Sequence, residues 1–140
     1  MAKKDLKNSI LEKVALNIQA ISSDTTTDGA AIDTKGYQSV TFVLQSATLT
    51  DGTYTPVIEE SDTGDFSGEE NAVADADLLG TEAAAAFAAA DDNEVRRIGY
   101  VGNKRYVRLT LVSTSTSTGG TLGAVAILGH PEVQETPVNS

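Results

Sequence analysis

The 140-residue sequence contains no cysteine and no tryptophan, and it has a single histidine, His130. A chain without cysteine forms no disulfide and no thiolate zinc site, and it has no cysteine nucleophile. One histidine is too few for a zinc site built on several imidazoles, and no serine lies in the nucleophile-elbow motif of serine hydrolases. The sequence therefore predicts a protein that is not an enzyme, with no cofactor and no catalytic metal.

Basic residues are also scarce, since ten Lys and Arg stand against twenty Asp and Glu, for a net charge of −10. Between Lys35 and Arg96 there are thirteen acidic residues and no basic one. Nucleic-acid binding requires a dense basic face, so we expect no nucleic-acid partner. We also expect no membrane partner, because no apolar run approaches the roughly 18 residues of a membrane-spanning helix. Glu12 and Lys13 interrupt the apolar residues near the N-terminus, so we expect synthesis in the cytoplasm without a signal peptide.

Apolar and polar residues alternate through several segments bounded by turn residues, which is the pattern of half-buried strands. The predicted strands cover residues 14–21, 30–33, 37–46, 54–60, 96–101, 104–112 and 121–129. Pro56 cannot donate a ladder hydrogen bond, which places its strand at an edge or a bulge. We predict an all-β protein, an antiparallel β-sandwich of jelly-roll type with about seven or eight strands.

The predicted sandwich forms a single domain over residues 14–130. A flexible N-terminal arm, residues 1–13, precedes it and contains a short amphipathic helix through Leu6, Ile10 and Leu11. A C-terminal tail, residues 131–140, follows it.

The segment RRIGYVGNKRYVRLTLV, residues 96–112, carries half of the basic residues of the chain. Gly102 and Asn103 between two apolar runs predict a β-hairpin closed by a tight type II′ turn. On the returning strand, Val107, Leu109 and Leu111 share the face that we expect to be buried. The arginines of this segment either pair with acidic neighbours or bind the carboxylates of a partner. The candidate interface residues, with the N-terminal lysines added, are Lys3, Lys4, Lys7, Arg96, Arg97, Lys104, Arg105 and Arg108.

Three other segments are less regular. Residues 22–29 form a polar loop, and residues 61–79 form a long acidic connection that Phe66, Val73, Leu78 and Leu79 attach to the body. The carboxylates of this connection do not match the spacing of a calcium-binding loop, so a solvated loop is favoured and calcium stays an alternative. The alanine-rich residues 81–93 are equally compatible with a helix that Thr81 caps and with an extended segment.

Three motifs occur in a fixed order: Ile-Asp-Thr-Lys-Gly-Tyr at residues 32–37, Glu-Ser-Asp at 60–62, and the segment from Gly99 to Arg108. This ordered set resembles the small capsid decoration, or cement, proteins of tailed bacteriophages, over residues 10–130. The alanine-rich segment departs from the resemblance. The resemblance implies a β-sandwich that forms dimers or trimers on the outside of the virion. There it would bind the major capsid protein and bridge neighbouring subunits. Alternatives are another virion component, such as a neck, tail or head-fibre protein, and a carbohydrate-binding β-sandwich.

Overall fold

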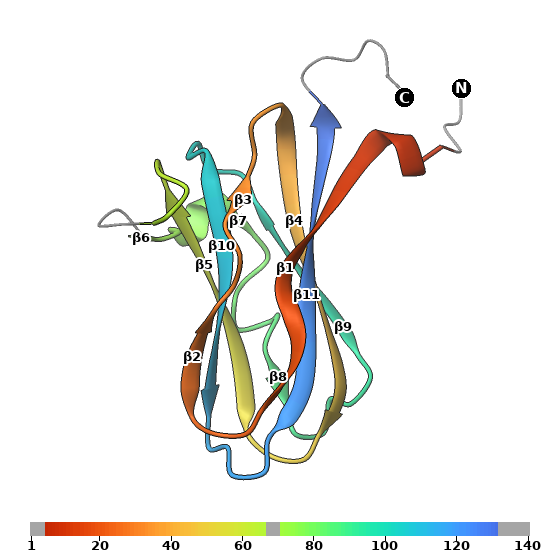
Figure 1. Cartoon of the computed structure of the whole chain (residues 1–140), viewed down its shortest axis with the longest axis vertical. Helices are drawn as coiled ribbons and strands as arrows, with labels where there is room; N and C mark the ends of the chain where they lie inside the picture. The colour runs from red at the N-terminus through yellow and green to blue at the C-terminus, as the bar shows by residue number, and fades with distance from the viewer. Residues whose placement is uncertain (1–4, 67–70, 132–140) are drawn as a thin grey trace.

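The computed structural model describes residues 5–66 and 71–131, which form two antiparallel sheets packed face to face (Figure 1). The five-stranded sheet consists of β1 (Ile10–Ile21), β11 (Gly120–Pro131), β4 (Tyr37–Leu49), β9 (Val95–Tyr100) and β7 (Leu78–Leu79), in that order. The second sheet has the order β2 (Thr25–Asp28), β10 (Tyr106–Thr114), β5 (Thr53–Ser61) and β6 (Asn71–Ala72). At its margins β3 (Ile32–Asp33) pairs with β10, and β8 (Phe87–Ala88) pairs with β5. Two short 3₁₀ helices, η1 (Lys7–Ser9) and η2 (Asp75–Asp77), complete the described elements.

The topology is that of a jelly roll. In chain order the eight strands of the roll are β1, β2, β4, β5, β6, β9, β10 and β11. The first pairs with the eighth, the second with the seventh, the third with the sixth and the fourth with the fifth. A long antiparallel ribbon that is rolled up around a core gives this set of pairs. The predicted all-β sandwich is confirmed, and seven of its strands have four or more residues.

The core lies between the sheets and consists of aliphatic side chains with a few aromatic ones. Val107, Leu109 and Leu111 of β10 are fully buried, as their alternation predicts. From the other sheet β11 contributes Leu122, Ala124, Ala126 and Leu128, and β4 contributes Val40, Phe42 and Leu44. β11 lies between β1 and β4 in the five-stranded sheet, and its residues Val125 and Ile127 point away from this core.

The predicted hairpin over residues 96–112 is wrong. β9 belongs to the five-stranded sheet, where it pairs with β4, whereas β10 belongs to the second sheet, where it pairs with β5. The chain crosses between the sheets from Tyr100 to Tyr106, and Gly102 does not have the positive φ of a type II′ turn. A substituent at Gly102 would lie 2.6 Å from the hydroxyl oxygen of Tyr100. This glycine is therefore needed for the close approach of an aromatic ring.

The first strand also differs from its predicted pattern. β1 begins at Ile10, so residues 10–13, expected in the arm, pair with the end of β11, and the predicted helix is reduced to the single turn of η1. Two register shifts in β1 place the neighbours Ala15 and Leu16 both in the core, while Ile18 is 81% exposed. A bulge rotates the side chains that follow it, and this breaks the alternation expected for residues 14–21.

The three segments without a clear sequence pattern contain short strands and turns. Part of the predicted loop 22–29 is the strand β2. The alanine-rich segment contains one turn, in which Ala84 N–H donates to Thr81 Oγ1 (3.0 Å), and then enters β8, so no α-helix forms there. Of the four side chains expected to attach the acidic connection, Phe66, Val73 and Leu78 are buried and Leu79 is exposed. Glu69 and Glu70 of this connection lie outside the described residues.

Pro56 occupies a stretch of β5 that has a ladder partner on one side only. β8 pairs with residues 53–54 and β6 with residues 59–60, so the outer edge between them has no strand. Ile58 N–H, which points to the same side as the nitrogen of Pro56, donates instead to Glu82 Oε1 at 2.7 Å. β5 as a whole is not the edge strand of its sheet, but Pro56 lies in a stretch of it that has no outer neighbour.

Candidate interaction surfaces

The structure separates the candidate interface residues from one another. Lys3 and Lys4 lie outside the described residues, and Lys7 is exposed on η1. Arg96 and Arg97 lie on β9 and Arg108 lies on β10, in opposite sheets, and Lys104 and Arg105 lie on the crossover between them. They therefore do not form one basic patch, and each must be described by its own neighbours.

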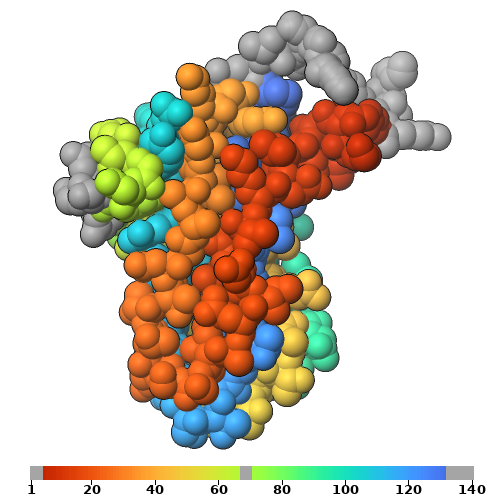
Figure 2. Space-filling model, viewed as in Figure 1, coloured from red at the N-terminus to blue at the C-terminus, as the bar shows by residue number. Residues whose placement is uncertain are grey.

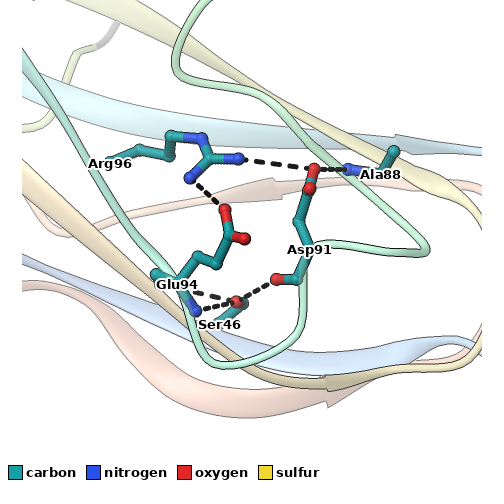
Figure 3. A network of polar contacts seen from close by, with 5 residues as sticks. All are labelled: Ser46, Ala88, Asp91, Glu94 and Arg96. Carbon is teal, nitrogen blue, oxygen red and sulfur yellow. Dashed lines mark hydrogen bonds and ion pairs between the residues drawn. The ribbon is translucent and has the colours of Figure 1, made fainter.

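Arg96 belongs to a network of polar contacts with residues of the same chain (Figure 3). Its guanidinium contacts Asp91 Oδ2 at 3.4 Å and donates to Glu94 Oε1, and it lies 5.0 Å from the centre of the Phe87 ring. Ser46 of β4 links the same segments, because its hydroxyl donates to the carbonyl of Asp91 and accepts from Glu94 N–H. Arg96 thus holds residues 91–94 against the five-stranded sheet, which is a structural role.

Arg108 lies on the outer side of the second sheet, between a carboxylate and an aromatic ring. Its Nε donates to Glu59 Oε1 at 2.7 Å, and its guanidinium stacks 4.5 Å from the centre of the Phe66 ring. The Arg108 side chain is 16% exposed and that of Glu59 is 20% exposed. Partly buried ion pairs of this kind are costly to break, because the remaining charge loses its partner.

Arg105 forms a two-pronged ion pair with Asp33 of β3. Its Nε and Nη2 each donate to a carboxylate oxygen of Asp33 at 2.8 Å, the geometry that arginine favours with carboxylates. These hydrogen bonds lower the pKa of Asp33 to about 2. The pair ties the crossover to the segment before β4, since Thr34 N–H and Oγ1 also donate to the carbonyl of Arg105.

Tyr100 is buried beneath the crossover and binds it to the second sheet. Its buried hydroxyl donates to Glu60 Oε1 at 2.7 Å and accepts from Lys104 N–H at 3.0 Å. Burial and the hydrogen bond to Glu60 raise the pKa of Tyr100 above its ordinary value. The ammonium of Lys104 meets Asp62 at 2.9 Å on the surface. Sequence patterns did not indicate this cluster, because its members come from different sheets.

One end of the sandwich is nevertheless richer in cations than the rest. η1, the beginning of β1, the turn between β3 and β4 and the crossover all lie at this end, shown at the top of Figure 1. The basic residues there are Lys7, Lys13, Lys35, Lys104 and Arg105. Figure 2 shows the beginning of β1 projecting from the body at this end. We name this group of residues the basic end.

The outward side of the five-stranded sheet is a different kind of surface. Val14 and Ile18 of β1, Val125 and Ile127 of β11, Val43 of β4 and Val95 of β9 lie on it, as the burial of their chain neighbours shows. An open hollow of about 580 Å³ lies over β1, β11 and β4, with Gly123 in its lining. Arg97 stands beside these side chains, and no ion pair joins it to any residue that the structure describes. We name this surface the outer apolar face.

Other kinds of site find little support. Residues 5–66 and 71–131 contain no group of three or more His, Asp or Glu side chains that could hold a metal ion. No helix in the same residues is long and apolar enough to cross a membrane. Ser39 Oγ contacts His130 Nδ1, but within the described chain no carboxylate is hydrogen-bonded to that ring. All seven Tyr and Phe residues are described: five are buried, and Tyr37 and Tyr106, which are partly exposed, lie on strands of opposite sheets, so this part of the chain shows no exposed row of aromatic rings.

No protein-family model matches the sequence, and no curated protein matches it. Among solved structures, the fold is similar to that of the PBSX exported protein XepA, with a TM-score of 0.58 and 16% identity over 93% of this chain and 42% of that one. The SPBc2 prophage-derived protein YomS is also similar, with a TM-score of 0.48 and 14% identity over 86% of this chain and 95% of that one. The chain thus spans less than half of the XepA chain, with which it shares a fold.

Proposed function

We propose that this chain is a structural protein of a bacteriophage virion that binds the outer face of the capsid as a cement protein. In this role it bridges neighbouring major capsid subunits and acts by adhesion, with no bond made or broken. The sequence resemblance to capsid decoration proteins supports the proposal, and the jelly-roll sandwich is the fold that this resemblance implies.

The observation that carries the proposal is the basic end. The chain has a net charge of −10, yet five of its ten basic residues lie at this end, on η1, the beginning of β1, the β3–β4 turn and the crossover. Lys104 and Arg105 pair there with Asp62 and Asp33, and no ion pair within the described residues joins Lys7, Lys13 or Lys35. An acidic body repels copies of itself and other acidic surfaces, so it orients the molecule with this end toward an acidic partner. Contacts of this kind are individually weak and become strong when copies that are joined in one oligomer bind the shell together.

Capsids assembled without this chain provide the test. We expect the purified chain to bind them in many copies and to raise the temperature at which they release their DNA. The double variant Lys7→Glu and Lys35→Glu should reduce the number of bound copies at least about tenfold, because it reverses two charges at the basic end. The matched control, Lys7→Arg and Lys35→Arg, keeps the charges and should bind like the natural chain.

Sedimentation of the particles with quantitative gel analysis gives the number of bound copies. A chain that does not bind capsids, or a charge-reversed variant that binds as well as the control, would overturn the proposal. Purified virions separate it from the alternative of a neck or tail component. A cement protein covers the whole shell in many copies, and a neck protein occupies a single vertex.

A further inference from the structure

We propose that two copies of this chain associate through the outer apolar face, in a symmetric dimer whose two-fold axis runs parallel to the strands between β11 and β4. The inference does not depend on a location in a virion. It rests on the composition of this face, on two charges that it carries and on the register of its strands.

The two outer surfaces of the sandwich differ in composition. The outer apolar face presents β-branched aliphatic side chains from four neighbouring strands, and Val14 and Ile18 are 57% and 81% exposed. On the second sheet the corresponding positions hold Arg108 and Glu59, which form an ion pair, and Thr110, which donates to the same carboxylate. A sheet that faces water alternates apolar and polar residues, as the second sheet does. A sheet with apolar residues on both faces is typical of one covered on both sides.

The outer apolar face carries one acidic and one basic side chain, Glu12 and Arg97. Glu12 lies opposite Ile127 and Arg97 opposite Val43, at the two margins of the face. In the described part of the chain neither forms an ion pair, whereas Arg96, Arg105 and Arg108 all do. In a chain with a net charge of −10 this face has no net charge, so two copies repel each other least here.

The register shows that the face is complementary to itself. Val14, Val125, Val43 and Arg97 lie in one row across β1, β11, β4 and β9. The proposed axis exchanges β11 with β4 and β1 with β9, so Val43 of each copy lies over Val125 of the other. Arg97 then lies over the second copy's Val14, two residues along the strand from its Glu12. Arg97 and the second copy's Glu12 are thus offset by about 6.6 Å along the strand, a distance that their long side chains can span.

The next row fits in the same way. Gly123, Gln45 and Val95 are aligned across three strands, and Ile18 lies over Gly123, where a substituent would be 2.8 Å from Ile18 Cγ1. The axis places Val95 against the second copy's Ile18. It also places the side chain of Gln45 over the hollow above the second copy's Gly123. Each row thus contributes two symmetry-related apolar contacts, Val43 with Val125 in the first row and Val95 with Ile18 in the second. The hollow of each copy is filled by Gln45 of the other.

The size of the face suits a stable dimer. β1, β11 and β4 contribute some nine residues each and β9 contributes six, which at spacings of about 4.8 Å and 3.3 Å cover roughly 500–600 Å². The accessible surface of a corrugated sheet exceeds this projection, so each copy would bury close to the approximately 800 Å² of a standard protein interface. Two sheets packed at about 10 Å with their strands nearly aligned form the ordinary core of a β-sandwich.

Sedimentation equilibrium of the full chain tests the proposal. We expect a dimer, and we expect Val43→Glu to raise its dissociation constant at least about 100-fold, because it buries two charges at the centre of the interface, each against Val125 of the other copy. Val112→Glu is the matched control, since it places the same change on β10, on the outer side of the second sheet, and should leave the dimer intact. Thermal unfolding of both variants establishes that they are folded.

A charge exchange tests the orientation. Arg97→Glu alone should weaken the dimer about tenfold, because it places a carboxylate beside the second copy's Glu12. Adding Glu12→Arg to the same chain should restore the affinity, since the exchange preserves a surface pair. A chain that is monomeric at high concentration, equal effects of Val43→Glu and Val112→Glu, or a double variant weaker than the single one would each overturn the proposal.

Discussion

Asp51 shows how much a single side chain contributes to joining distant loops. Its carboxylate accepts hydrogen bonds from the N–H groups of Ser117, Thr118 and Gly119 and from the Ser117 hydroxyl, at 2.8 to 3.1 Å. These donors hold the pKa of Asp51 well below its ordinary value of 3.8. Asp51 lies in the turn between β4 and β5, and its partners lie more than 60 residues away, in a loop whose Ser and Thr repeats carry no local sign of them.

The replacement Asp51→Asn should lower the melting temperature, because one of the two acceptor atoms becomes a donor that faces N–H groups. A carboxyl whose pKa is lowered by folding stabilises the native state above its unfolded pKa, and this stabilisation is lost as the pH falls through the folded pKa. The difference in melting temperature between the natural chain and the variant should therefore be full above about pH 4 and shrink at lower pH. Scanning calorimetry from pH 7 to 2 measures it. Asp75→Asn, on η2, is the control, and an equal effect of both replacements would contradict the prediction.

Gly119 and Gly36 allow the cost of an unfavourable backbone conformation to be measured apart from the cost of a steric clash, because both have a positive φ and only Gly119 is crowded. Both have a φ near +90°, but a substituent at Gly119 would lie 1.8 Å from the carbonyl oxygen of Ile21, and at Gly36 nothing lies within 4 Å. Gly36→Ala should cost about 1 kcal/mol, from the backbone conformation alone. Gly119→Ala should cost about 2–4 kcal/mol, since the backbone must also move. Urea unfolding of both variants measures the difference, and equal losses would show that the contact at Gly119 is relieved without cost.

At the scale of elements, strand positions were largely predictable and strand partners were not. Alternation of apolar and polar residues located β4, β5 and β10, because each has one face in the core, and a short apolar run bounded by glycines located β11. The same local signal cannot distinguish a hairpin from a crossover. Residues 96–112 contain two strands and a Gly-Asn turn in either case, and the decision depends on β4 and β5, which lie about 50 residues earlier. The predicted jelly roll itself argued against the hairpin, because most of its consecutive strands lie in opposite sheets.

The arginines of β9 and β10 show that a local sequence pattern does not identify the partner of a side chain any more than that of a strand. The sequence indicated that they pair with acidic neighbours or bind a partner, and only the structure assigns each one. Arg108→Ala should lower the free energy of unfolding by about 1–3 kcal/mol, because it removes the cation over the Phe66 ring and leaves the mostly buried Glu59 with only the Thr110 hydroxyl as a donor. Arg97→Ala should change it by less than about 0.5 kcal/mol, as expected for a surface residue without partners. Chemical denaturation at low protein concentration compares them, and a larger loss for Arg97→Ala would reverse the assignment.

At the scale of the whole molecule, the boundary between arm and body is set by strand pairing. Residues 10–13 of β1 pair with residues 126–129 of β11, whereas Leu6, Lys7 and their neighbours are exposed. The sequence placed the boundary after residue 13, because the apolar residues near the N-terminus fit a short helix as well as a strand. The structure moves it to Ile10. The removable arm is therefore shorter than its composition indicates.

Two truncations test this boundary and its consequence for capsid binding. Removing residues 1–9 should leave the free energy of unfolding unchanged to within about 1 kcal/mol, since no buried side chain of the described residues is lost. Removing residues 1–13 should cost about 2 kcal/mol or more and promote aggregation, because it uncovers the edge of β11. If the arm contacts the capsid, the shorter truncation reduces the number of bound copies while the fold is retained. Circular dichroism and particle sedimentation on the same samples separate these effects. Full binding by the shorter truncation would assign the contact with the shell to the rest of the basic end, which is Lys13, the turn at Lys35 and the crossover.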